Sequence, residues 1–183
     1  FETLIRFDDL SEALPQGYAT VLEAVNPNGR NAFYLGIVGG QWQLEADDSN
    51  NTEGNSCAGG DAACQAASLS EGVLYHLAVT VSGTAFTLYV DGVDTFSGSL
   101  PRSPTFGAAR WVLGADTDDG VAFESDSFGG VMDEARLWSG VLDAEQIGCL
   151  GGYALNGSEP GLLGYWPMNE LPGAPIAPDE ATG

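Results

Sequence analysis

Apolar and polar residues alternate along many short segments of this chain, with the two-residue period of β-strands. The clearest pair is 74–81 and 85–90, joined by Ser82-Gly83-Thr84, and Asp91-Gly92 is a hairpin turn sequence directly after it. The other predicted strands are 1–7, 18–25, 31–39, 41–45, 93–96, 109–114, 130–138 and 161–166. Many short strands with closely spaced turns indicate an all-β fold, an antiparallel two-sheet β-sandwich.

One short connector helix interrupts this pattern. Asp143 is the predicted N-cap, Gln146 its capping-box partner, and Gly151-Gly152 ends the helix. Residues 46–70 are polar and Gly-rich, which predicts a long surface loop without a strand. No linker precedes residue 171, so we expect one domain over residues 1–170 and an extended Pro/Gly-rich tail over residues 171–183.

The charge of the chain is unusual. Its 183 residues include 26 acidic residues and five basic ones, all Arg, which gives a net charge of −21. Such a surface repels nucleic acid and anionic lipid, and no apolar stretch is long enough to insert into a membrane. It favours cations, and it also suits a protein kept soluble in salty surroundings.

The cysteines favour an oxidising, extracellular environment. Cys57 and Cys64 are close enough in sequence to form a small disulfide ring, and Cys149 is left over, either as a buried free thiol, which we favour, or in an intermolecular bond. Asn50 and Asn156 lie in glycosylation sequons. The chain starts at Phe1 without an initiator Met or signal peptide, so we expect a processed form or a piece of a longer protein.

Three stretches together resemble a known family. YHLAVTVSGTAFTLYVDG (75–92), LG…FGGVMDEARLWSGVLDAEQI (113–147) and GLLGYWPMNE (161–170) are similar to laminin-G-like and pentraxin-like domains of the concanavalin A-like lectin/glucanase superfamily. The resemblance implies a jelly roll of two curved sheets with ligands bound at the rim loops. It also implies an opening strand beside the last strand, which this sequence lacks, so we expect that this strand is either lost in processing or supplied by another chain or an upstream segment. An unpaired sheet edge accepts strands from neighbours.

The connection between the predicted strands 109–114 and 130–138 is rich in acid. Five acidic residues fall within residues 116–126, where the composition of the chain predicts one or two. Without a cation these carboxylates repel one another by about 1 to 4 kcal/mol per pair. Calcium takes six to eight oxygen ligands from closely spaced carboxylates and carbonyls. A surface acidic cluster without a metal is the alternative reading.

Pentraxin-like members bind calcium through this same connection. The resemblance implies the ligand set Asp116, Thr117 through its carbonyl, Asp118, Glu124 and Asp126. A further ligand comes from the early polar turn, with Asn26, Asn28 or Asn31 as candidates and Asn31 as our choice, although Arg30 departs from the acidic residue typical of the family. Zinc is not expected, because His76, the single His, lies inside a strand and no Cys/His cluster exists.

Catalysis is not expected. Related glucanases carry two carboxylates on one strand, but Glu124-Ser125-Asp126 is followed by Ser127-Phe128-Gly129 without a second Glu. Asp133 is expected to hydrogen-bond backbone groups. The favoured function is a non-catalytic, extracellular, calcium-binding recognition or adhesion module for a glycan or an extracellular protein. Trp42, Trp111 and Tyr34 could stack on sugars, although core packing is favoured for all three.

An alternative function is structural. A missing strand, an extended tail and a spare Cys149 would suit a subunit of an extracellular filament or adhesin that polymerises by strand complementation.

Overall fold

The computed structural model describes residues 1–10, 18–27, 31–46, 62–107, 109–115, 117, 129–170 and 178–182. Within them the chain forms strands and one short helix, and the predicted all-β fold is confirmed. In chain order the elements are β1 (Glu2–Phe7), β2 (Tyr18–Val25), β3 (Asn31–Val38), β4 (Gln41–Glu45), β5 (Ala62–Ala66), β6 (Leu74–Ser82), β7 (Ala85–Val90), β8 (Val93–Ser99), β9 (Arg110–Leu113), β10 (Gly130–Trp138), α1 (Ala144–Leu150) and β11 (Leu162–Trp166).

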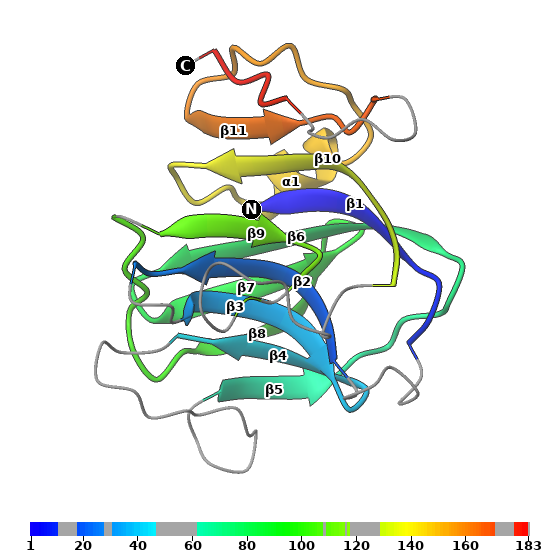
Figure 1. Cartoon of the computed structure of the whole chain (residues 1–183), viewed down its shortest axis with the longest axis vertical. Helices are drawn as coiled ribbons and strands as arrows, with labels where there is room; N and C mark the ends of the chain where they lie inside the picture. Colours follow the sequence, from blue (N-terminus) through cyan, green and yellow to red (C-terminus); the bar gives the residue numbers. More distant parts are fainter. Residues whose placement is uncertain are drawn as a thin grey trace.

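The strands form two antiparallel sheets that pack face to face (Figure 1). The six-stranded sheet has the order β11-β10-β1-β6-β7-β8, and the five-stranded sheet has the order β5-β4-β3-β2-β9. Strands distant in sequence are therefore neighbours, as where β1 lies between β6 and β10. This arrangement confirms the predicted sandwich.

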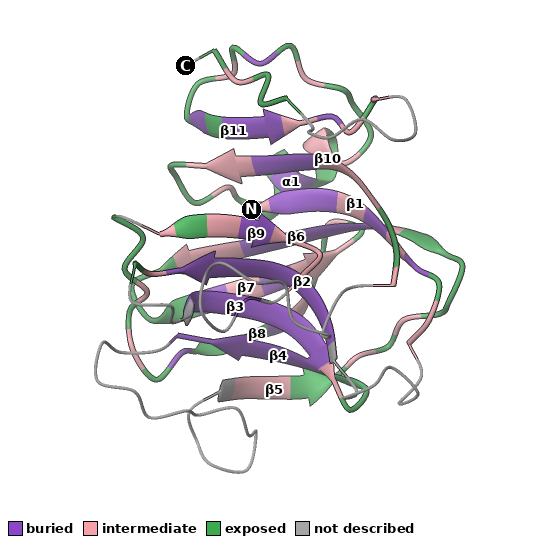
Figure 2. Ribbon diagram, in the orientation of Figure 1, coloured by how far each residue is buried: buried purple, intermediate pink, exposed green. Residues whose placement is uncertain are grey.

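The core lies between the sheets, and β2, β3 and β4 are almost wholly buried (Figure 2). Alternation along β3 directs Phe33 and Leu35 into this core. Phe7 from β1 meets Trp42 from β4 edge to face, with ring centroids 6.4 Å apart, and both side chains are fully buried. The two sheets are thus joined through aromatic packing at their centre.

The turn between β7 and β8 has the geometry that its sequence predicts. Asp91 and Gly92 have φ angles of 52° and 76°. Positive φ at both central residues is the type I′ arrangement, whose twist matches that of the flanking strands. The predicted hairpin is confirmed.

Helix α1 also begins as predicted. The Asp143 side chain accepts a hydrogen bond from the Gln146 backbone, and the Gln146 side chain accepts one from the Asp143 backbone. Ile147 is the buried residue of this helix, whereas Cys149 is a free and exposed thiol. The prediction that Cys149 is buried was therefore wrong. Residues two positions apart in a helix lie on different faces, so Cys149 is exposed when Ile147 packs inward.

The prediction that residues 46–70 contain no strand was also wrong. β5 pairs antiparallel with β4 at the edge of the five-stranded sheet, with Cys64 opposite Gln43. Its sequence AACQA has neither β-branched residues nor apolar alternation, so it resembles a loop. Pairing with β4 supplies backbone hydrogen bonds that a sequence pattern does not reveal.

The C-terminal segment returns to the sheet. The Glu180 backbone N–H donates to the carbonyl of Tyr165 in β11 at 2.7 Å, and the Thr182 N–H donates to the carbonyl of Gly157 at 2.7 Å. Residues 178–182 thus lie at the outer edge of β11, the position where the family pattern places an opening strand. The domain boundary at residue 170 and the supply of an opening strand by another segment stay predictions. No helix in the described ranges is long and apolar enough to span a membrane.

Candidate functional site

The predicted calcium ligands are only partly described. Asp116, Asp118, Glu124 and Asp126 lie outside the described residues, as does the side chain of Asn31, so this ligand set stays a prediction. Thr117 is described, and it is buried. In the part of the chain that the structure describes, no three Asp, Glu, His or Cys side chains are grouped so that they could hold a metal ion.

Thr117 is fixed to the five-stranded sheet by a buried carboxylate. Its backbone N–H and its hydroxyl both donate to Oε2 of Glu23, at 3.0 and 3.1 Å. Glu23 lies on β2 and is 1% exposed. The two bonds hold the start of the acid-rich connection onto β2, since hydrogen bonds to a buried carboxylate are stronger than those between neutral groups.

Through this contact Thr117 is attached to β2, the strand that precedes the early polar turn in the chain. Glu23 precedes Val25 by two residues, and Val25 pairs with Asn31 at the start of β3. Two strand residues span about 7 Å. Glu23 and the Val25–Asn31 pair are therefore about 7 Å apart along the strand.

Replacement of Glu23 by Ala is expected to release Thr117. The buried Thr117 N–H would lose its acceptor, at a cost of about 1–3 kcal/mol, and its amide hydrogen would exchange faster with solvent. Hydrogen exchange measured at Thr117 checks this result. The matched control is Thr117→Val, which removes only the hydroxyl bond and should leave the amide protected; equal loss of protection in both variants would contradict the assigned contact.

Glu23 belongs to a row of buried polar residues, of which only Tyr34 was expected from the sequence to be buried. It pairs with Tyr34 on β3, which pairs with Glu45 on β4. Gln43 Nε2 donates to Glu45 Oε2 at 3.1 Å, and each of these four residues is at most 3% exposed. Strand alternation places them on the face opposite Phe33 and Leu35. The available signal was an acidic residue inside an apolar strand, as in VLEAV and QWQLEA.

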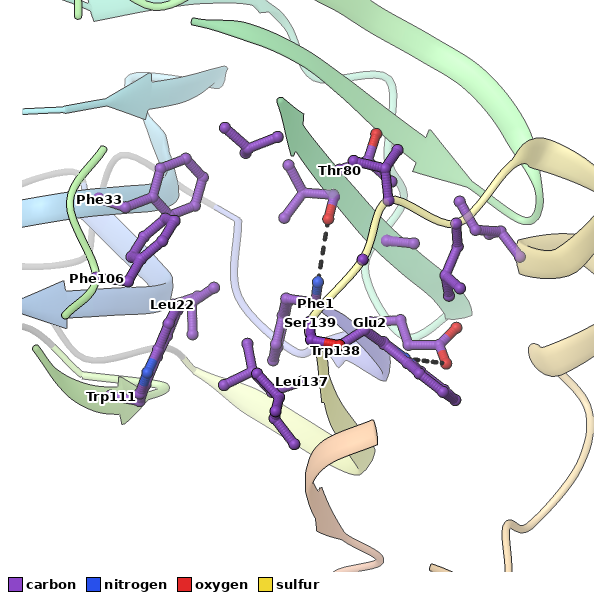
Figure 3. Close-up of a pocket in the computed structure, with 18 residues that line it drawn as sticks. Phe1, Glu2, Leu22, Phe33, Thr80, Phe106, Trp111, Leu137, Trp138 and Ser139 are labelled. Atoms are coloured by element: carbon purple, nitrogen blue, oxygen red, sulfur yellow. Dashed lines mark hydrogen bonds between the residues drawn. The ribbon is translucent and has the colours of Figure 1, made fainter. Parts of the chain in front are cut away.

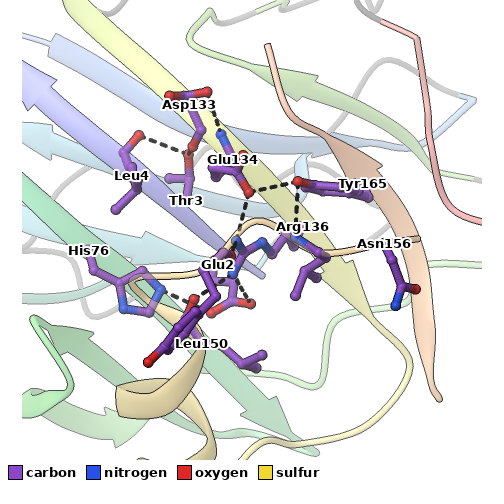
Figure 4. A network of polar contacts seen from close by, with 12 residues as sticks. Glu2, Thr3, Leu4, His76, Asp133, Glu134, Arg136, Leu150, Asn156 and Tyr165 are labelled. Carbon is purple, nitrogen blue, oxygen red and sulfur yellow. Dashed lines mark hydrogen bonds and ion pairs between the residues drawn. The ribbon is translucent and has the colours of Figure 1, made fainter. Parts of the chain in front are cut away.

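A second buried polar cluster lies on the six-stranded sheet, beside α1 (Figure 4). Glu2 Oε2 is 2.9 Å from Nε2 of His76, and Glu2 Oε1 accepts from Arg136 at 3.3 Å and from the Trp138 indole at 3.1 Å. Arg136 also donates to Glu134 at 2.7 Å, which accepts from the Tyr165 hydroxyl at 2.8 Å. The cluster joins β1, β6, β10 and β11.

This cluster reaches the helix region through backbone groups. Arg136 donates to the carbonyl of Leu150 at 2.9 Å and to that of Tyr153. Gly151 packs against the His76 ring, so closely that a Cβ at this position would lie 2.4 Å from Nδ1. The loop after α1 is thereby held against the sheet, and His76, the strand residue expected from the sequence, has a structural role.

Glu2 makes stability depend on pH. Burial alone would raise the pKa of Glu2, but the hydrogen bond with His76 and the charge of Arg136 outweigh burial and hold that pKa below its ordinary value of 4.5. Because the folded-state pKa is the lower one, the contribution of Glu2 is complete above pH 4.5 and is lost as pH falls through the folded-state pKa.

The expected result is a pH-dependent difference between the wild type and Glu2→Gln. Chemical denaturation in chelator should give a difference in unfolding free energy that is largest near pH 7 and shrinks toward pH 3. A difference that stays constant over this range would contradict the lowered pKa.

The three aromatic residues considered for sugar stacking differ in their exposure and packing. Trp42 is 0% exposed and belongs to the core cluster, which confirms core packing for this residue. Tyr34 is 3% exposed, but it lies between Glu23 and Glu45 on the face opposite that cluster. Trp111 is half-buried and stacks on Phe106, with ring centroids 5.2 Å apart and planes inclined by 28°. Both rings line a cavity of about 440 Å³ at one end of the sandwich, across from Phe1 and Leu137 (Figure 3).

Two other predicted sites are only partly tested. Cys57 and Asn50 lie outside the described residues, so the Cys57–Cys64 bond and the Asn50 sequon stay predictions. Asn156 is exposed, and its side chain accepts a hydrogen bond from the Ser158 backbone at 2.9 Å. Asp133 accepts from the Glu134 N–H at 2.9 Å, which confirms its predicted bond to the backbone.

Sequence comparison identifies one family. Residues 11–148 match a laminin G-type family model described as the concanavalin A-like lectin/glucanases superfamily. Curated protein sequences give no match.

Solved structures with the same fold include carbohydrate-binding proteins. A candidate carbohydrate-binding protein from Bacteroides ovatus has a TM-score of 0.68 and 18% identity, over 97% of this chain and 48% of its own. The CBM40 module of the Ruminococcus gnavus IT-sialidase, bound to α2,3-sialyllactose, has a TM-score of 0.56 and 15% identity, over 82% of this chain and 80% of its own. A heptameric pentraxin from Limulus polyphemus has a TM-score of 0.59 and 16% identity, over 82% of this chain and 68% of its own. This chain thus spans about half the length of the Bacteroides protein.

Proposed function

The chain belongs to the concanavalin A-like lectin/glucanases superfamily, and from this premise we propose that it is an extracellular, non-catalytic glycan-binding module whose site depends on calcium. The carbohydrate-binding proteins that share its fold support the glycan. The observation that supports the calcium dependence is the pair of bonds from Thr117 to Glu23, which fix one residue of the acid-rich connection to β2.

The donor set suits calcium in its chemistry. Asp116, Asp118, Glu124 and Asp126 supply carboxylates, while Thr117 and Asn31 would add a carbonyl and an amide oxygen, all hard oxygen ligands of the kind that calcium prefers. When bound, the ion would neutralise the connection and offer coordination positions to sugar hydroxyls. The chain's own residues would then hold the rim in the shape that a glycan requires.

The absence of catalysis is part of the same proposal. Glu124 and Asp126 lack a second Glu on the same segment. His76, the single His, is bound to Glu2 on the neighbouring strand of the six-stranded sheet and is 8% exposed, so it is poorly placed to act as a general base. Adhesion through the glycan is the cellular role that this site would serve.

A glycan array in millimolar calcium and in chelator tests the proposal. We expect binding to a restricted set of glycans that disappears in chelator. The double variant Asp116→Asn/Asp118→Asn should lose this binding, whereas the matched control Asp47→Asn/Asp48→Asn removes the same charge from another acidic stretch and should retain it. An array without any chelator-sensitive glycan would refute the proposal.

A further inference from the structure

Among the described strands, β9 is one of four edge strands, together with β5, β8 and β11. β9 ends the five-stranded sheet, and in the described part of the chain it pairs with β2 alone. The Gly114 N–H donates toward β2, to the carbonyl of Val21 at 3.1 Å. Because backbone groups alternate in direction along an antiparallel strand, the N–H and C=O of Trp111 and Leu113 point to the open edge.

An apolar groove runs beside this edge. The cavity of about 440 Å³ adjoins a second one of about 160 Å³, and both are lined by Phe1, Leu22, Trp111 and Leu137. The smaller cavity adds Leu113 and Trp166. Leu137 of β10 lies across from Trp111 (Figure 3), and Trp166 belongs to β11, so side chains of the six-stranded sheet line the groove beside β9.

One wall of the groove depends on a glycine. A Cβ at Gly164 would lie 2.3 Å from the Trp166 ring, so the ring can occupy this place only because residue 164 has no side chain. Leu163, next to it, also lines the larger cavity and is 57% exposed. Large apolar side chains in such a position are typical of a binding surface.

We propose that this groove binds an extended strand of a partner polypeptide, which pairs with Trp111 and Leu113 of β9 and inserts alternate apolar side chains against Leu137 and Trp166. In strand addition, main-chain hydrogen bonds supply affinity and pockets for alternate side chains supply specificity. The groove offers both elements within one surface.

Charge defines the chemistry of the partner. Glu2 is the charged residue in the groove lining, and its carboxylate is already bound by His76, Arg136 and Trp138. The groove is therefore locally neutral, whereas the whole chain carries −21. The complementary ligand is a strand with an uncharged, alternately apolar centre and basic flanks.

The same observations disfavour two other occupants. Residues 178–182 of this chain are engaged at β11, where Asp179 accepts from the Tyr165 N–H at 2.8 Å and the Glu180 N–H donates to the Tyr165 carbonyl. A second copy of the chain would also carry a net charge of −21, so the two copies would repel each other. A separate, basic strand avoids both difficulties.

A synthetic peptide with alternating Val and Thr and a Lys at each end is the probe, added to the intact chain in chelator at low salt. Fluorescence anisotropy should show saturable binding of this peptide. The same peptide methylated on alternate backbone nitrogens lacks the N–H donors for strand pairing, so its affinity should be at least tenfold lower. Leu163→Lys should also weaken binding at least tenfold. The matched control is Val93→Lys. Val93 is 64% exposed and lies on β8, at the far edge of the same sheet, so this variant should bind the peptide as tightly as the wild type does.

Hydrogen exchange locates the contact. Bound peptide should slow exchange of the Trp111 and Leu113 amides, the two that point to the open edge. No binding, or binding that leaves these amides unchanged, would overturn the proposal. Slow exchange of both amides without peptide, together with a dimer in size-exclusion chromatography, would also overturn it, in favour of a second copy. Because the measurement is made in chelator, its outcome is independent of calcium and of glycan binding.

Discussion

Replacement of Arg136 by Met is expected to lower the free energy of unfolding by about 3–5 kcal/mol, the usual cost of removing one partner of a buried ion pair. Arg136 is 2% exposed and is bound to Glu2, to Glu134 and to the carbonyls of Leu150 and Tyr153. Without the guanidinium, two carboxylates and two carbonyls lose a donor. Met retains much of the apolar stem, so the loss reports the charge and hydrogen bonds rather than a cavity.

Urea denaturation followed by Trp fluorescence measures this change. The control is Arg6→Met, which removes the exposed pair between Arg6 and Asp8, whose side chains are 40% and 50% exposed. Surface pairs contribute about 0–1 kcal/mol. A loss at Arg136 no larger than the loss at Arg6 would mean that the buried cluster does not hold β1, β6, β10 and β11 together.

The second large effect is expected at Trp42. Trp42 is fully buried against Phe7, so Trp42→Ala should lower the free energy of unfolding by about 3–5 kcal/mol through lost contacts and a residual cavity. Trp111→Ala should cost less, because Trp111 is only half-buried beside an existing cavity. Comparing the two losses of unfolding free energy distinguishes a tryptophan in the core from a half-buried one on the same sheet.

The same denaturation experiment applies to both Trp variants, with Trp42→Phe as a milder substitution if Trp42→Ala does not fold. Trp42→Phe keeps an aromatic ring opposite Phe7 and should fall between the wild type and Trp42→Ala. Equal losses for Trp42→Ala and Trp111→Ala would contradict the described packing.

Local sequence predicted those parts of the fold that depend on neighbouring residues. The alternation in β6 and β7, the Asp91-Gly92 turn and the Asp143–Gln146 capping box involve groups within a few residues of one another, and all were confirmed. β5 was missed because its strand character comes from pairing with β4 across residues 46–61, and its own side chains do not show it.

The buried polar sites could not be predicted in the same way. Glu2 and Arg136 are 134 positions apart, and Glu23 and Thr117 are 94 apart, so only the folded sheet order brings them together. A buried acid is stable only with such partners. An acidic residue within an apolar strand was the visible clue, but it did not identify the partner. The location of Thr117 next to Glu23 is the part of the candidate site that the structure adds.

Calorimetric titration of the intact chain with calcium, combined with thermal melts in calcium and in chelator, tests the proposed metal dependence most directly. We expect a dissociation constant of about 10⁻⁴ to 10⁻³ M, the range of extracellular modules, and a higher melting temperature in millimolar calcium, since a ligand that binds only the folded state stabilises it. Asp116→Asn/Asp118→Asn should abolish both effects. No heat of binding and identical melting temperatures with calcium and with chelator would contradict a calcium site in the connection between β9 and β10.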